Sequence, residues 1–163
     1  MNDPPLETGS KQMRLEVHAG IQKFRVIHKK GEALHYAYET DGFAHFVKMD
    51  DANLPSNLSA PYFGYPSISD RVYQNTRNRI LSAQSNPFYY TGKVAHGVGC
   101  PHTPKEMIWP LALIAQARTE APHNMEQKIA LLKMIIASAT GDHRLHESFN
   151  ADNANVFTRA DFG

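Results

Sequence analysis

The chain has 163 residues, with 17 Lys and Arg against 16 Asp and Glu, which gives a formal net charge of +1. This balance excludes the strongly basic surface that attracts nucleic acid or an anionic membrane, so neither is an expected partner. No apolar run reaches the ~20 residues of a membrane-spanning helix, and residues 1–10 are too polar for a signal peptide, which favours a cytoplasmic protein.

The first part of the chain predicts a polar tail, a helix and a hairpin. Residues 1–10 are assigned to the tail and residues 11–163 to a single domain. Apolar residues recur at intervals of three or four between Met13 and Phe24, which predicts a helix. Alternating apolar and polar residues on both sides of Lys30-Gly31 predict a short β-hairpin.

The middle of the chain predicts two helix starts and one long loop. Asp50 and Asp51 precede Leu54-Pro55, and because proline suits the first turn of a helix, both acids are expected just ahead of a helix N-terminus. A clear helix is predicted over 70–82, and an Asn-Pro pair ends it. Residues 92–104 are rich in Gly, Pro and His, a composition that favours a long ordered loop.

Two further helices are expected after the loop. Residues 103–106 have the pattern of a capping box, but Pro110 inside a helix would remove a hydrogen bond, so the helix begins either there or near Trp109. The next helix is predicted over 124–140, ended by Gly141, with these residues facing inward: Ile129, Leu132, Ile135, Ile136 and Ala139. The repeated order of helix and long loop predicts a mainly α fold of helical hairpins whose loops gather at one end.

Metal, nucleotide and cysteine chemistry receive little support. The nine His residues form no His-Glu-x-x-His motif, and no zinc-type Cys pair occurs, so no metal site is expected. Gly97-Val98-Gly99 lacks the third glycine of a dinucleotide fingerprint, so we expect no cofactor. Cys100 and His102 stand too close in an irregular segment to face each other as nucleophile and base, so Cys100 is interpreted as a small buried residue.

The carboxylates carry a more specific signal. Glycoside hydrolysis needs one acid to protonate the leaving oxygen and a second carboxylate to activate water or to attack the sugar. Repulsion between the adjacent Asp50 and Asp51 favours one protonated carboxyl group, although ordinary helix capping is the simpler interpretation. Glu147 lies in an irregular segment and is either a second catalytic carboxylate or a surface acid. Arg159 and His102 are able to donate hydrogen bonds to sugar hydroxyls, or have structural roles.

Nine strings occur in one order along the chain, and their joint presence is far more specific than any single string. They are YETDGF (38–43), MDDANLPS (49–56), PYFGY (61–65), YQNTR (73–77), NPFYY (86–90), GVGCPHTP (97–104), IWPLALI (108–114), HESF (146–149) and FTR (157–159). From about Ala37 to Arg159 the chain resembles glycoside hydrolase family 125, which contains exo-acting α-1,6-mannosidases.

The resemblance implies an (α/α)6 toroid, no catalytic metal, and removal of a non-reducing terminal mannose with inversion. It places the general acid on Asp50 or Asp51, without choosing between them, and the general base on Glu147. Inversion requires the two carboxyl groups to stand roughly 6.5–9.5 Å apart, so that a water molecule fits. The remaining residues that the resemblance assigns to the mannose pocket are His102, Trp109, His146 and Arg159.

The resemblance also implies that the toroid is incomplete, because it covers roughly the latter half of the family's catalytic domain. Uncovered helix faces would then form exposed apolar patches. Cys100 stands where the family commonly has serine. Two alternatives to a mannosidase stay open: an inactive remnant that acts as a carbohydrate-binding or helical interaction module, and an unrelated helical enzyme that uses Cys100.

Overall fold

The computed structural model describes residues 4–139, 141 and 143–160. Its helices are α1 (Pro4–Phe24), α2 (Arg71–Ile80), α3 (Pro110–Arg118) and α4 (Met125–Ser138), with a short 3-10 helix at Ala60–Phe63. Antiparallel pairs join β1 (Val26–Ile27) to β2 (His35–Tyr36), β3 (Glu39–Thr40) to β4 (Phe46–Val47), and β5 (Tyr89–Thr91) to β6 (His96–Val98). A three-stranded antiparallel sheet has the order β7 (Met107–Ile108), β8 (Ser148–Asn150) and β9 (Phe157–Thr158).

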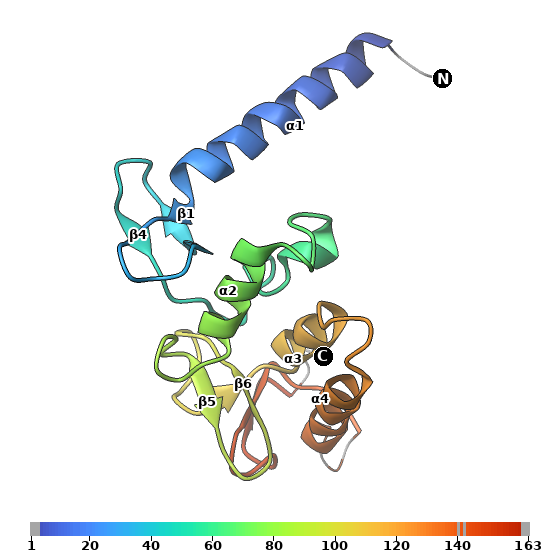
Figure 1. The fold of residues 1–163 in the computed structure, drawn as a ribbon. Coiled ribbons are helices and arrows are strands. Elements are labelled where there is room, and N and C mark those ends of the chain that lie inside the picture. Colours follow the sequence, from blue (N-terminus) through green and yellow to red (C-terminus); the bar gives the residue numbers. More distant parts are fainter. Residues whose placement is uncertain (1–3, 140, 142, 161–163) are drawn as a thin grey trace.

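Helix α1 leads away from the rest of the molecule (Figure 1). The helix begins at Pro4, so residues 4–10 of the expected polar tail are helical. Residues 7–10 are exposed to solvent, and an ion pair between Lys11 and Glu7, one turn apart, stabilises this part of the helix. The apolar side chain of Met13 is 67% exposed, whereas Ile21 packs against the hairpin at the other end.

The predicted hairpin and the helix predicted over 70–82 are confirmed. Strand β1 pairs with β2 so that Val26 lies opposite Tyr36, and Gly31 in the connecting turn has a φ of +86°, which glycine adopts readily. Asp70 caps α2, because its side chain accepts a hydrogen bond from the backbone N–H of Tyr73 at 2.7 Å. Tyr73 is fully buried and joins the helix to the hairpin.

Two other predictions for the middle of the chain are wrong. The segment after Leu54-Pro55 forms turns rather than a helix, and its polar groups are satisfied locally: Ser59 Oγ accepts a hydrogen bond from the backbone N–H of Ser56 at 2.8 Å. The predicted loop over 92–104 contains β6, which completes a hairpin with β5. A Cβ atom on Gly99 would lie 2.1 Å from the carbonyl oxygen of Met107, so glycine here permits close backbone packing rather than a flexible loop.

Helix α3 begins at Pro110 with Trp109 as its N-cap, which confirms one of the two predicted starts. Proline fits this first position because the first N–H groups of a helix have no partner within the helix. The capping box at 103–106 is not used, since the residues that follow it extend as β7 and pair with β8.

Helix α4 is confirmed, with Asn124 as the N-cap, but it ends at Ser138 and Thr140 lies outside the described residues. The predicted inward face is confirmed for Ile135, which packs against the main apolar cluster, but it is otherwise misplaced, because Leu131, Met134 and Ser138 are the buried residues. The side chains of Ile129, Leu132 and Ile136 are 46%, 51% and 72% exposed. The spacing of apolar residues could not show which face of α4 is buried, because both faces of this helix carry apolar residues. The exposed apolar patches expected from an incomplete toroid are therefore present.

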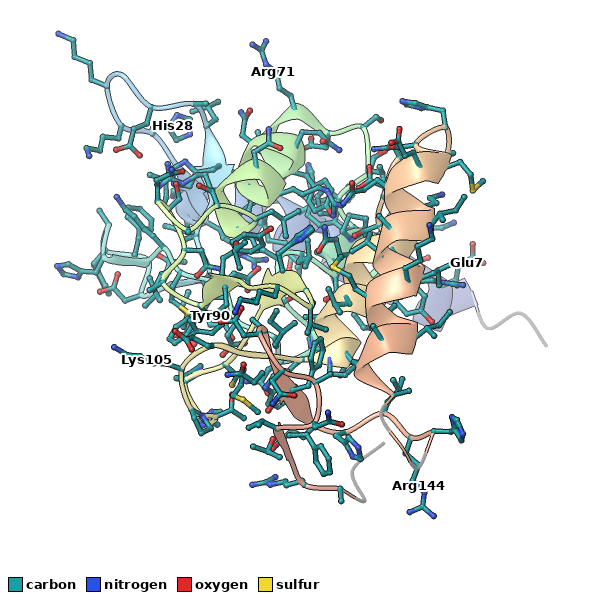
Figure 2. The ribbon with its side chains drawn as sticks, turned by 90° about the horizontal axis from the view of Figure 1, so that it is seen from below. Glu7, His28, Arg71, Tyr90, Lys105 and Arg144 are labelled. Carbon is teal, nitrogen blue, oxygen red and sulfur yellow. The ribbon has the colours of Figure 1, made fainter. Side chains whose placement is uncertain are left out.

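The described part of the chain is less helical than the sequence predicts. Helices α3 and α4 pack side by side as a helical hairpin, but turns and short strands of two or three residues form most of the rest. The largest apolar cluster lies between this hairpin and the sheet of β7 and β8, and it includes Ile108, Leu113, Leu131 and Phe149. Figure 2 shows Tyr90, which packs against this cluster, within the body, while Lys105 and Arg144 point outward. Among the described residues, no helix has the length and apolar character that crossing a membrane requires.

Candidate active site

Glu147 is the acidic residue with the most defined surroundings. It lies directly before β8, and its side chain is only 6% exposed. Its Oε2 atom accepts a hydrogen bond from the hydroxyl of Thr158 at 3.0 Å, and its Oε1 atom lies 3.1 Å from a guanidinium nitrogen of Arg159. Successive residues of a strand point to opposite faces. Arg159 follows β9 with a φ of +48°, and this left-handed turn lets both neighbours reach one carboxylate.

Glu147 lines a cavity of about 250 Å³ at the beginning of α3. The other lining residues are Trp109, Pro110, Leu111, Ile114, Leu145 and His146. Most of this wall is apolar, with the carboxylate and one imidazole ring as its polar groups. Such a wall binds the apolar face of a ligand, while the few polar groups fix its orientation.

Trp109 and His146 hold their positions through neighbours outside the cavity. The indole N–H of Trp109 donates a hydrogen bond to the hydroxyl of Thr103 at 3.3 Å. The ring of His146 stacks on Phe157 with centroids 3.8 Å apart, and its Nδ1 atom lies 3.0 Å from the carbonyl oxygen of Ala160. Both side chains are nearly buried, so the cavity wall is preformed.

Of the four residues expected in the pocket, three are brought to Glu147 and one is not. Trp109 and His146 line the same cavity, and Arg159 pairs with the carboxylate. His102 is exposed in the turn before β7 and does not line the cavity.

Asp50 is enclosed by its own loop. It is 1% exposed, and its two oxygens accept hydrogen bonds from the backbone N–H groups of Asp51 and Leu58, both at 3.1 Å. Neither bond caps a helix, so the helix-capping interpretation is wrong for this residue. Asp50 instead ties the MDDAN segment to the turns that follow it.

Asp51 is 5% exposed and is held by several donors. Its Oδ1 atom accepts hydrogen bonds from the backbone N–H of Asn53 at 2.9 Å and from the hydroxyl of Tyr38 at 3.3 Å. Its Oδ2 atom accepts a hydrogen bond from the side-chain amide of Asn53 at 3.1 Å. Asp50 and Asp51 are both absent from the wall of the cavity that contains Glu147.

The thiol of Cys100 connects the two acidic regions electrostatically. It is buried, and its Sγ atom lies 3.9 Å from Oδ2 of Asp51. Burial raises the pKa of Cys100, and the negative charges of Asp51 and Glu147 raise it further. Cys100 and Trp109 also belong to one apolar cluster. The buried thiol thus lies next to Asp51 and in the same apolar cluster as Trp109.

The sequence model described as metal-independent alpha-mannosidase (GH125) matches residues 1–163. The chain belongs to glycoside hydrolase family 125. It is 39% identical over 144 residues to the meiotically up-regulated gene 157 protein of Schizosaccharomyces pombe, a match that covers 88% of this chain and 28% of that protein.

A solved structure from glycoside hydrolase family 125 is also similar to this chain. It is a metal-independent α-mannosidase of Streptococcus pneumoniae in a non-productive complex with α-1,6-mannobiose. The TM-score is 0.85 at 39% identity, over 92% of this chain and 34% of that chain. The chain therefore spans about a third of the length of the relatives it matches, less than the half that the sequence suggests.

Among residues 4–139, 141 and 143–160, no group of three or more His, Cys, Asp or Glu side chains is arranged to hold a metal ion.

Sequence reasoning missed the hydroxyl groups around Glu147. Thr158 donates to the carboxylate, and Ser148 lies 2.6 Å from Thr158. No pattern of composition or periodicity marks either residue. Both residues do lie in the family 125 strings HESF and FTR. Their contact with Glu147 can be inferred from these strings only once β8 and β9 are known to pair.

The buried carboxyl group of Asp50 predicts a pH-dependent stability. Burial raises its pKa to about 7, hydrogen bonds from backbone N–H groups oppose this, and the charge of Asp51 adds to it. The folded state then binds a proton that the unfolded state has lost, so stability is highest below the unfolded pKa and is lost as the pH rises through the folded pKa. We expect the unfolding free energy to fall by about 2 kcal/mol between pH 5 and 7 from this group.

Urea unfolding of the wild type and of Asp50→Asn at pH 5, 6 and 7 measures this contribution. The difference between the two proteins matters, because burial lowers the pKa of His35 and gives a pH dependence of opposite sign. Parallel pH dependences in both proteins would contradict the expectation for Asp50.

Proposed function

We propose that this chain forms part of a glycoside hydrolase that removes a terminal, non-reducing α-1,6-linked mannose with inversion. The observation that carries the proposal is the cavity that joins Glu147 to Trp109 and His146 in a member of family 125. The α-1,6-mannobiose in the Streptococcus pneumoniae structure supports the choice of substrate.

Glu147 is the proposed general base. It is a nearly buried carboxylate at the edge of a small apolar cavity, and its position is fixed by two partners. A base of this kind takes a proton from the water that attacks the anomeric carbon. Trp109 is proposed to pack against a sugar face, while His146, Arg159 and, from the neighbouring turn, His102 bind hydroxyl groups.

Asp51 is the better of the two acid candidates in this chain. Asp50 has both oxygens bonded to backbone N–H groups inside its loop, so a glycosidic oxygen has no access to it. Asp51, in contrast, is bonded partly by side chains, among them the hydroxyl of Tyr38 and the amide of Asn53. The acid role requires that substrate displaces such a donor.

The (α/α)6 toroid and the separation of the two carboxyl groups remain predictions. The toroid is supported by the similarity to the family 125 mannosidase and by the exposed apolar side chains of α4. Further helices of such a ring would cover these side chains. The separation expected for an inverting enzyme is roughly 6.5–9.5 Å.

The proposal is tested by mixing α-1,6-mannobiose with the native protein and following the reaction by proton NMR. Mannose released with inversion appears first as the β-anomer and then equilibrates with the α-anomer. A parallel reaction with α-1,2-mannobiose is the control for linkage. Absence of release from α-1,6-mannobiose, or an early product mixture without an excess of the β-anomer over its equilibrium share, would contradict the proposed reaction.

A binding module without turnover is the second candidate. It is favoured by the absence of both aspartates from the cavity wall and by the apolar patches that a further polypeptide would cover. Saturable binding of mannobiose by the native gene product, with no mannose formed after prolonged incubation, would support this function over hydrolysis.

A further inference from the structure

We infer that Thr158 is a positioning residue for Glu147 and that Ser148 sets the direction of the Thr158 hydroxyl. The inference rests on the proposed function, because positioning matters here only if Glu147 takes a proton from water. It identifies which of the two carboxylate oxygens is held and which one reacts.

The direction of the hydrogen bonds follows from the number of protons. Thr158 has one hydroxyl proton, and the Glu147 carboxylate has none to give, so the proton of Thr158 points to Oε2 at an oxygen–oxygen distance of 3.0 Å. Ser148 Oγ lies 2.6 Å from Thr158 Oγ1. Because the Thr158 proton is already used, Ser148 must be the donor in this second bond.

The sheet holds this chain of hydroxyls in place. Ser148 and Thr158 are directly opposite each other in the antiparallel pair of β8 and β9, so their side chains lie on the same face. Ser148 is completely buried, which keeps water from competing for its hydroxyl. The Ser148–Thr158 pair therefore presents a preformed donor to one side of Glu147.

The other oxygen of Glu147 has different surroundings. Oε1 lies 3.1 Å from Arg159, whose side chain is 66% exposed. Oε2 is held inside the sheet, whereas Oε1 faces a partner at the surface. We assign the proton transfer from water to Oε1, with Oε2 held as the anchor.

The test compares Thr158→Val, which keeps the shape and removes the donor, with Thr158→Ser, which keeps the donor. In the native gene product, Thr158→Val is expected to lower kcat for α-1,6-mannobiose about 10-fold with little change in KM. The donor orients the carboxylate without contacting the substrate, so its loss acts on kcat and not on KM. Thr158→Ser is expected to restore kcat, and Ser148→Ala to produce a smaller loss of kcat.

The outcomes separate this inference from the proposed function. A normal kcat for Thr158→Val, or a loss of kcat that Thr158→Ser does not restore, would overturn the positioning role. If the Val variant fails to fold, Ser148→Ala decides in the same way. If Glu147→Gln keeps full activity, the proposed base is wrong. If only Thr158→Val is unaffected, the base stands and the positioning role fails.

Discussion

Glu147→Gln is expected to lower kcat for α-1,6-mannobiose by about 10³-fold, with a much smaller effect on KM. Glutamine has the size of glutamate and can still accept a hydrogen bond from Thr158, but it cannot take a proton from water. General base catalysis contributes about 10²- to 10⁴-fold. The other polar side chain of the cavity wall, His146, is held by its stack on Phe157 and by the carbonyl oxygen of Ala160, so it is not positioned as Glu147 is. Steady-state hydrolysis by the native gene product measures the loss.

Glu126→Gln is the matched control for this experiment. It makes the same chemical change on the exposed first turn of α4, so kcat should remain within about twofold of the wild type because the residue lies outside the cavity. A Glu147→Gln protein with the kinetics of the control would contradict the assignment of the base.

The acid is tested separately by the choice of leaving group. Asp51→Asn should slow hydrolysis of mannobiose strongly but spare a 4-nitrophenyl mannoside, because a nitrophenolate leaves without being protonated. Equal effects on both substrates would indicate a binding role for Asp51. A normal rate on mannobiose would assign the acid to a carboxyl group outside residues 1–163.

The elements with local signals were predictable from sequence. The helix at α2 has a capping residue, a buried stripe and a breaking Asn-Pro pair, and all three act within about fifteen residues. The hairpin of β1 and β2 has alternation around a glycine. Strands β7, β8 and β9 were not predictable in this way, because each has two or three residues and exists only through partners elsewhere in the chain, such as Asn150 opposite Met107.

The residues of the candidate site also fall into those that the sequence predicted and those that depend on contacts between distant segments. The resemblance to family 125 selected Glu147, Trp109 and His146, and the structure brings these three to one cavity. Periodicity could not show that Thr158 would support the carboxylate, because this contact depends on the register of β8 and β9. The apolar face of α4 was misassigned for a related reason: a helix with apolar residues on several sides does not reveal which neighbour it packs against.

A buried ion pair between α2 and the turn after α3 predicts the largest effect on stability. Arg77 lies 2.6 Å from Glu120, and their side chains are 7% and 12% exposed. The guanidinium also donates to the hydroxyl of Thr119 at 3.2 Å. Although burial opposes it, the charge of Arg77 and the hydrogen bonds of Glu120 lower the pKa of that carboxyl group, so the pair is charged at neutral pH.

We expect Arg77→Met to lower the unfolding free energy by about 3–5 kcal/mol at pH 7, because it leaves the Glu120 charge buried without its partner. Arg79→Met is the control on the same helix: Arg79 lies 3.8 Å from Glu32 at a more exposed site, and such pairs contribute about 0–1 kcal/mol. Urea unfolding of the 163-residue chain compares the two. Replacing both Arg77 and Glu120 with apolar residues should recover most of the loss, since no buried charge then remains unpaired. Equal losses for Arg77→Met and Arg79→Met would show that the pair does not hold α2 to this turn.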